Sequence, residues 1–133
     1  MSTQKDRIVD LLQNSYGAGP EYLWAKYPEF AVFRHPGSGK WFGLLMELPR
    51  GKMGLGGDGT VWVLDVKCGP ILSASLLSEK GFAPAYYMSK ATWISILLDG
   101  TLPDERIDFL IGLSYDAAAP KAKAKRAQGE ANV

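Results

Sequence analysis

The chain of 133 residues is 47% hydrophobic and 22% charged, which is ordinary for one globular domain with a single core. Its one cysteine excludes an internal disulfide framework, and without a signal-peptide core or an apolar run of about 18 residues the sequence predicts a cytoplasmic protein that does not enter a membrane. The net charge of +1 divides unevenly, with seven basic and four acidic residues in 34–98 but one basic and five acidic residues in 99–118, so the middle of the chain can form a mildly basic surface.

The N-terminal stretch predicts an amphipathic helix followed by an aromatic segment. Within residues 5–14, three aliphatic side chains between Ile8 and Leu12 recur at helical spacing and form one apolar stripe. Thr3, or the serine before it, is suited to cap the start of this helix. Residues 20–27 then carry two tyrosines, a leucine and a tryptophan. We expect this segment to be a helical turn or a packed loop that covers the core.

Three strands are predicted in the middle of the chain. Residues 31–35 and 40–48 flank a Pro-Gly-Ser-Gly turn, which favours an antiparallel hairpin. Residues 61–67 are rich in β-branched side chains and form the third strand. The connection over residues 49–59 contains five glycines and two basic residues, Arg50 and Lys52, and we expect it to be a mobile loop.

The second half of the chain predicts a helix, a hairpin and a final helix. Residues 70–78 open with a proline, which suits the first turn of a helix. Residues 85–88 and 93–98 are expected to form the hairpin, with Lys90 at its tip. An amphipathic helix then starts at Pro103 with acidic residues in its first turn. The predicted fold is α+β, an antiparallel sheet with helices packed on it, in the order α-βββ-α-ββ-α.

We expect one domain over residues 1–118 and a disordered tail over residues 119–133. The tail is rich in alanine and lysine and has no large apolar residue before its last position. Such a segment cannot bury a core. Its four basic residues suit a solubilising end at least as well as a dedicated arm for nucleic acid.

No motif for catalysis, a metal or a cofactor is complete. Residues 37–40 are similar to the end of a phosphate-binding loop, but Arg34 stands where the first glycine is required and Trp41 where a serine or threonine is required. The glycine pattern of residues 54–59 precedes a predicted strand, so the helix N-terminus that would hold a pyrophosphate is missing. One histidine and one cysteine are too few for a usual metal site or an oriented nucleophile. We therefore expect no enzyme, no metal and no cofactor.

The stretch from Pro84 to Gly100 resembles the MmcQ/YjbR family of small bacterial proteins. That family carries a Lys-x-x-Trp pattern between a proline and a Leu-Asp-Gly sequence, and the matching residues are Pro84, Met88, Lys90, Trp93, Leu98, Asp99 and Gly100. Further matches are Pro103-Asp104-Glu105, Ser114-Tyr115, Val32-Phe33-Arg34, Lys40-Trp41-Phe42 and Val66-Lys67-Cys68. The resemblance thus covers residues 16–118. The chain departs from the family at Tyr87, Ser89 and Thr92, where the family often has histidine, asparagine and a second histidine.

The resemblance implies a "double-wing" arrangement in which hairpins contact double-stranded DNA. Lysine and arginine contacts with phosphates dominate such affinity, and stacking aromatic side chains add to it. The candidate residues are Arg34, Lys40, Arg50, Lys52, Lys67, Lys90 and Trp93, with Trp41 as a second stacking candidate, although both tryptophans also suit the core.

Two other functions remain open from the residues alone. One is a protein- or peptide-interaction module that uses the sheet face or its edge, and the other is a small-ligand pocket under the glycine-rich loop. Basic residues gathered on one face would favour DNA, whereas an exposed apolar patch would favour an interaction module. In each case we expect a monomer.

Overall fold

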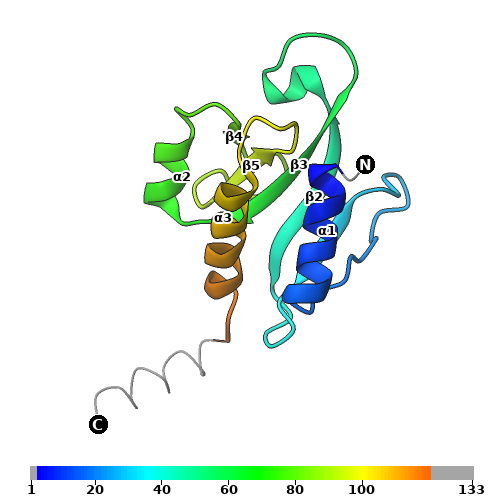
Figure 1. The fold of residues 1–133 in the computed structure, drawn as a ribbon, viewed down its shortest axis with the longest axis vertical. Coiled ribbons are helices and arrows are strands. Elements are labelled where there is room, and N and C mark those ends of the chain that lie inside the picture. The colour runs from blue at the N-terminus through cyan, green and yellow to red at the C-terminus, as the bar shows by residue number, and fades with distance from the viewer. Residues whose placement is uncertain (1–2, 121–133) are drawn as a thin grey trace.

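The computed structural model describes residues 3–120, which contain three α-helices, one short 3₁₀ helix and five strands (Figure 1). In chain order these are α1 (Gln4–Ser15), β1 (Ala31–Arg34), β2 (Trp41–Pro49), η1 (Arg50–Met53), β3 (Thr60–Lys67), α2 (Pro70–Leu76), β4 (Phe82–Pro84), β5 (Trp93–Leu97) and α3 (Asp104–Ala117). The predicted order of the main helices and strands is confirmed. Most of the predicted tail, residues 121–133, lies outside the described residues.

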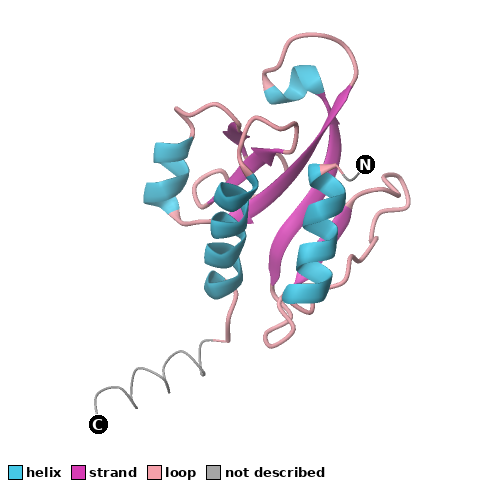
Figure 2. Ribbon diagram, in the orientation of Figure 1, coloured by secondary structure: helices cyan, strands magenta, loops and turns pink. Residues whose placement is uncertain are grey.

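The strands form one antiparallel sheet in the spatial order β1-β2-β3-β5-β4 (Figure 2). The long strands β2 and β3 occupy the middle, and β5 lies between β3 and the short edge strand β4. Because neighbouring strands run in opposite directions, the β1–β2 turn, the end of β3 and the start of β5 lie at one end of the sheet. The helix η1 lies at the other end (Figure 1).

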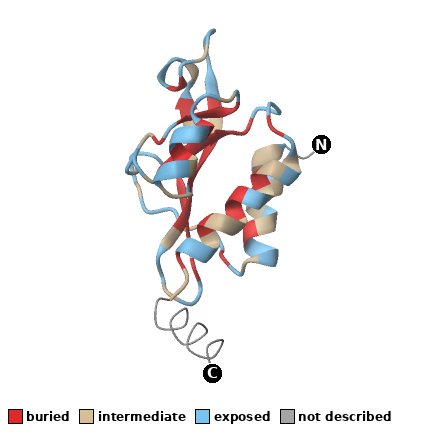
Figure 3. Cartoon of the chain, turned by 90° about the vertical axis from the view of Figure 1, so that its left-hand side faces the viewer, coloured by how far each residue is buried: buried red, intermediate tan, exposed pale blue. Residues whose placement is uncertain are grey.

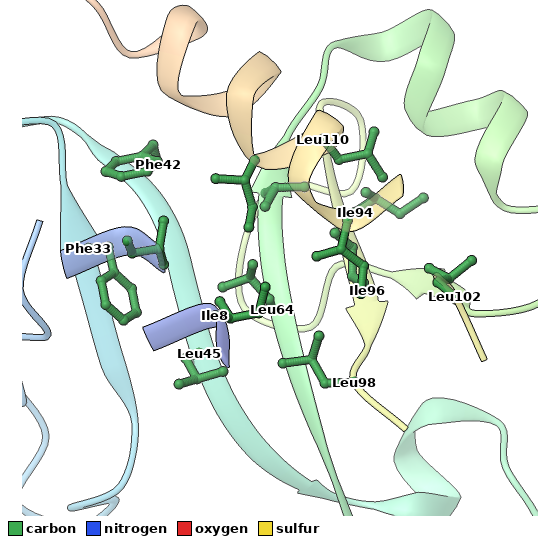
Figure 4. Packing of buried hydrophobic residues seen from close by; sticks show 14 of the residues in the cluster. Ile8, Phe33, Phe42, Leu45, Leu64, Ile94, Ile96, Leu98, Leu102 and Leu110 are labelled. Atoms are coloured by element: carbon green, nitrogen blue, oxygen red, sulfur yellow. The ribbon is translucent and has the colours of Figure 1, made fainter. Parts of the chain in front are cut away.

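Helices α1 and α3 cover one face of the sheet. Ile8 of α1 and Leu110 of α3 belong to one buried cluster with Leu64 and Ile96 of the central strands (Figure 4). The apolar stripes of both helices are buried, and their outer faces are exposed (Figure 3). Salt bridges between Arg7 and two aspartates of α3 tie the helices together, the shorter at 2.8 Å. As predicted, the Thr3 hydroxyl caps α1, accepting from the N–H of Asp6.

The opposite face carries a second apolar cluster that loops cover instead of helices. Its strand residues are Val32, Leu44, Met46, Leu48, Val61, Val63, Ala83 and Leu97. The cover comes from Trp24 and Phe30, from Met53 of η1, and from Tyr86 and Met88. The aromatic segment before β1 is therefore a packed loop, fixed to the sheet edge by a bridge between Glu21 and Val32.

The predicted strand over residues 85–88 is wrong. The strand that pairs with β5 is Phe82–Pro84, and residues 85–92 form bends and turns. Proline has no N–H to continue a ladder, so it is tolerated at the end of this edge strand and helps to stop it. The following residues leave the sheet plane, and Tyr86 and Met88 pack over the second face. The partner strand was predicted correctly, since β5 begins at Trp93.

A β-bulge at the start of β2 is held by a buried serine of α3. The register between β1 and β2 shifts at Phe33 and Arg34, which leaves Phe42 without a ladder partner. The Ser114 hydroxyl donates to the carbonyl of Phe42 at 2.6 Å and accepts from the N–H of Lys67 at 2.9 Å. Ser114 is fully buried, so it satisfies two backbone groups that water does not reach. This contact docks the end of α3 against the same end of the sheet as the β1–β2 turn.

Replacement of Gly81 by alanine tests the packing at the sheet edge. Gly81 has a φ of +97°, and an added Cβ would lie 2.6 Å from Cγ of the buried Leu102. Gly100 has a similar φ of +89° but open space around the Cβ position, so Gly100→Ala measures backbone strain alone. We expect Gly81→Ala to lower the free energy of unfolding by about 1–3 kcal/mol more than Gly100→Ala, the usual range for overpacking. Urea denaturation checks this, and equal losses in the two variants would contradict it.

Candidate binding surfaces

Four of the predicted basic residues come together at one end of the sheet. Arg34 ends β1, Lys40 precedes β2, Lys67 ends β3, and Lys90 lies in the turn that leads into β5. We call these four residues the strand-end cluster. Neighbouring strands are about 4.8 Å apart, so the cluster spans roughly 14 Å from β1 to β5. The three lysines are exposed and form no ion pair with any described residue, whereas Arg34 pairs with Glu21 at 3.1 Å.

The other two predicted basic residues lie at the opposite end of the sheet. Arg50 and Lys52 belong to η1, which follows the far end of the nine-residue strand β2, roughly 26 Å along the strand direction. Arg50 donates through Nε to the carbonyl of Gly56 at 2.7 Å and so holds its own loop. Lys52 lies over the ring of Tyr86, with Nζ at 5.8 Å from the centroid. Arg50 and Lys52 are therefore too far from the strand-end cluster to share one contact surface with it.

Trp93 is buried, with 7% of its surface exposed. It is the first residue of β5, it pairs with Lys67, and its N–H donates to the carbonyl of Ser89. Trp41 is only half-buried and faces the loop-covered side. Of the two tryptophans that are candidates for stacking, Trp41 is the less buried.

A hollow of about 280 Å³ opens on the loop-covered face, between the segment before β1 and the segment after β4. We call it the aromatic pocket, and its lining residues are Trp24, Tyr27, Phe30, Trp41, Leu44, Tyr87 and Met88. The indoles of Trp24 and Trp41 meet at 79° with centroids 5.9 Å apart, and Tyr27 stacks on Phe30 at 4.7 Å. Tyr87 completes the ring set, 6.0 Å from Phe30.

Two cations lie over the rings that line this pocket. The guanidinium of Arg34 is 5.9 Å from the centroid of Trp41, and Nζ of Lys26 is 5.8 Å from that of Tyr27. Neither residue lines the pocket itself. Larger hollows elsewhere, such as one of about 410 Å³ beside α1 and one of about 440 Å³ beside α2, have no comparable ring set.

A buried carboxyl group lies behind the aromatic pocket. Asp65 of β3 is fully buried and stands opposite Leu44, a pocket-lining residue of β2. Its Oδ1 accepts a short hydrogen bond from the hydroxyl of Ser95, its partner on β5, and its Oδ2 has no hydrogen-bond partner among the described residues. Burial raises the pKa of Asp65 to about 7, against the opposing effects of Ser95, the backbone N–H groups of Tyr86 and Tyr87, and the charge of Lys90.

Sequence reasoning missed both this carboxyl group and the pocket in front of it. Asp65 was treated only as part of a β-branched strand, although a lone acid between Leu64 and Val66 is itself a signal of a buried polar group. The pocket joins residues 24–44 to residues 87–88, which no local pattern could bring together. The small-ligand alternative concerns a different place, the glycine-rich loop, where Gly54 and Leu55 line a separate hollow of about 310 Å³.

Residues 3–120 contain neither a metal-binding cluster nor a helix suited to span a membrane. Within this range no group of three or more His, Cys, Asp and Glu side chains is arranged to hold a metal ion. No helix in it has the length and apolar character needed to cross a membrane. The single histidine, His35, has a structural place, since Nδ1 accepts from the N–H of Gly37 at 2.9 Å and the ring stacks on Tyr115.

Comparison with known proteins places most of the chain in one family. The sequence model of the YjbR family matches residues 13–117. The uncharacterized protein YyaQ of Bacillus subtilis is 40% identical over 115 residues, which cover 86% of this chain and 97% of YyaQ. The uncharacterized protein YjbR of Escherichia coli K12 is 33% identical over 66 residues, or 47% of this chain and 56% of that protein.

Solved structures show the same fold. A crystal structure of a Pseudomonas syringae protein, 40% identical, superposes with a TM-score of 0.83 over 89% of this chain and 99% of its own. A solution structure of a Pseudomonas syringae protein gives 0.78 at the same identity, over 89% and 93%. The Deinococcus radiodurans protein DR2400, 21% identical, gives 0.62 over 86% and 77%, a likeness of fold alone.

Proposed function

We propose that this chain, which belongs to the YjbR family, binds double-stranded DNA and catalyses no reaction on it. The observation that supports the proposal is the strand-end cluster, in which three exposed lysines and Arg34 share one end of the sheet. Duplex DNA carries one negative charge for about every 1.7 Å of its axis, so a cluster roughly 14 Å wide faces several phosphates. Arg50 and Lys52 play no part in this contact.

The basic sequence at the C-terminus begins at the same end of the molecule. The hydroxyl of Ser38, in the β1–β2 turn, donates to the carbonyl of Ala118 at 2.5 Å. This bond places the last described residues beside Lys40. The sequence that follows contributes Lys121, Lys123, Lys125 and Arg126. These four basic residues add to the net attraction of the chain for phosphates.

The absence of catalysis is also a proposal, and it is supported by the surroundings of the most perturbed group. Asp65 has a raised pKa, but the residue is fully buried and cannot reach a DNA strand from the pocket wall. His35 accepts turn N–H groups through Nδ1. Neither residue has the exposed nucleophile or base partner that hydrolysis of a phosphodiester would need.

A matched pair of double variants tests DNA binding. Lys67→Ala/Lys90→Ala removes two charges from the strand-end cluster, and Arg50→Ala/Lys52→Ala removes two from the opposite end. We expect the first to reduce the magnitude of the slope of log affinity against log salt by about 1.8, or 0.9 for each lost phosphate contact, and the second to leave it unchanged. Fluorescence anisotropy with a labelled duplex measures the slope in the full chain, so that the C-terminal charges are the same in every protein.

Equal slopes for the two double variants would contradict a contact at the strand-end cluster. Failure of the wild-type chain to bind a duplex even at low salt would rule out the DNA-binding proposal. A protein- or peptide-interaction module would then be the leading alternative, because two of the large side chains that line the loop-covered face, Tyr27 and Tyr87, are exposed.

A further inference from the structure

The aromatic pocket has the features of a site for an organic cation. We propose that it binds the methylated ammonium group of a small molecule, with the rings of Trp24, Trp41 and Tyr87 as its walls and the carboxyl group of Asp65 behind them. This inference does not depend on DNA binding, because no residue of the strand-end cluster lines the pocket. Two of them act from outside it, Arg34 over Trp41 and Lys90 on Asp65.

The geometry of the rings supports a cation in the pocket. The faces of aromatic rings carry negative electrostatic potential, and a cation within about 6 Å of a centroid is attracted to them. Because Trp24 and Trp41 meet at 79°, they form two walls at nearly a right angle. Phe30 and Tyr27 lie beside them, and Tyr87 closes the far side from the segment after β4. Cages of this kind recognise quaternary ammonium groups.

The chain's own cations confirm how these rings attract charge but leave the pocket interior without a positive group. Arg34 lies over Trp41 and Lys26 over Tyr27, each at a distance typical of a cation–π contact. Arg34 is also bound to Glu21 and to the carbonyl of Gly39, which fixes it at the rim. No lysine or arginine lines the pocket. Of the described cations, none lies over Trp24 or Tyr87, so these two rings remain open to the charge of a ligand.

Asp65 supplies a negative charge behind the pocket when it loses its proton, which burial delays until the pH reaches its raised pKa of about 7. Directly opposed residues of antiparallel strands have Cβ atoms about 5 Å apart, so the carboxyl group lies beside the side chain of Leu44 on the pocket floor. Its Oδ2 has no hydrogen-bond partner among the described residues, and the residue is fully buried. An unpaired buried carboxylate is costly, and a cation on the other side of one layer of side chains reduces that cost.

The apolar lining of the pocket favours a methylated ammonium group over a primary one. A primary ammonium group needs several hydrogen-bond acceptors when it leaves water, and the pocket wall consists of rings, one leucine and one methionine. A methylated ammonium group needs none. The volume of about 280 Å³ is at the lower limit for ligand pockets, so it suits a small head group.

The test compares choline with 3,3-dimethyl-1-butanol, in which an uncharged carbon replaces the ammonium nitrogen. Binding of each compound to the full chain is measured by NMR titration. The tryptophan indole N–H signals report binding. We expect choline to bind at least about tenfold more tightly than the isostere, which has the same shape without the charge. Trp24→Leu should abolish choline binding, whereas Trp62→Leu, which removes another half-buried indole on the helix-covered side, should not. The variant Lys40→Ala, which removes a strand-end charge that does not act on Asp65, should still bind choline as the wild type does, and this separates the result from the DNA proposal.

Asp65 acts here as a positioning residue, so its test is a pH profile. Ser95 faces it from β5, and Leu44 lies opposite it on β2. The segment after β4 contributes the charge of Lys90 and the backbone N–H groups of Tyr86 and Tyr87. Choline affinity should rise about tenfold between about pH 5 and about pH 8, as Asp65 loses its proton. In Asp65→Asn the affinity should stay at the low-pH value throughout. His35 lies on Tyr115, away from the pocket, and leaves this profile unchanged.

Three results would overturn the inference. They are equal affinities for choline and its isostere, no choline binding by the folded wild-type chain, and equal losses in the Trp24 and Trp62 variants. If Trp24→Leu does not fold, Tyr87→Leu replaces it, since Tyr87 is 52% exposed and its loss leaves the core intact. A Tyr87→Leu protein that is folded and still binds choline as the wild type does would also count against the cage.

Discussion

The wild-type protein is expected to lose stability as the pH rises from about 4 to about 7, and Asp65→Asn is expected to lose much less. Burial raises the pKa of Asp65 in the folded protein from 3.8 to about 7. Between these two values the folded state holds a proton that the unfolded state has released, so unfolding becomes more favourable as the pH increases. The stabilising proton is fully present below the unfolded pKa and is lost as the pH passes the folded pKa.

The size of this effect follows from the shift. One unit of pKa corresponds to about 1.4 kcal/mol, so a shift to about 7 is worth up to about 4 kcal/mol. Urea denaturation at several pH values measures it, and the informative quantity is the difference in unfolding free energy between wild type and Asp65→Asn. Other carboxyl groups titrate equally in both proteins and cancel. A difference that does not change with pH would show that Asp65 is charged in the folded state.

The sequence was sufficient for the elements that have local signals. Thr3 before an apolar stripe predicts α1, and the Pro-Gly-Ser-Gly turn predicts the pairing of β1 with β2. The segment after β4 was misjudged because its residues satisfy two descriptions. Tyr86 to Met88 have the aromatic and aliphatic character of a strand, but these side chains instead cover the second face of the sheet. Composition cannot separate a strand from a loop that packs on one, since both bury apolar surface.

Of the two candidate sites, the strand-end cluster could be predicted from the sequence and the aromatic pocket could not. Arg34, Lys40 and Lys67 stand at predicted strand ends, so the antiparallel order alone places them together, and the same reasoning sets Arg50 and Lys52 apart at the far end. The aromatic pocket could not be found in that manner. It depends on how two loops distant in sequence meet over Leu44, and on a bulge that turns Trp41 toward that face. Such contacts are decided by packing in three dimensions.

Trp93→Ala is expected to lower the free energy of unfolding by about 3–5 kcal/mol, the usual range for truncation of a large buried aromatic side chain. Trp93 is 7% exposed and begins β5, which lies between β3 and the edge strand β4. Its loss removes buried apolar surface and leaves a cavity that the sheet cannot close, because the backbone here is fixed by pairing with Lys67 and by the hydrogen bond to Ser89.

Phe109→Ala is the matched control for this variant. Phe109 is also a large aromatic residue, but it lies on the outer face of α3 with 65% of its surface exposed, so its truncation should change stability by less than about 0.5 kcal/mol. Urea denaturation of both variants gives the comparison. If the midpoint of Trp93→Ala equals that of the wild type, the indole is exposed in solution. In that case Trp93 would return as a stacking residue beside Lys90, and the same variant should then weaken binding to the duplex without loss of fold.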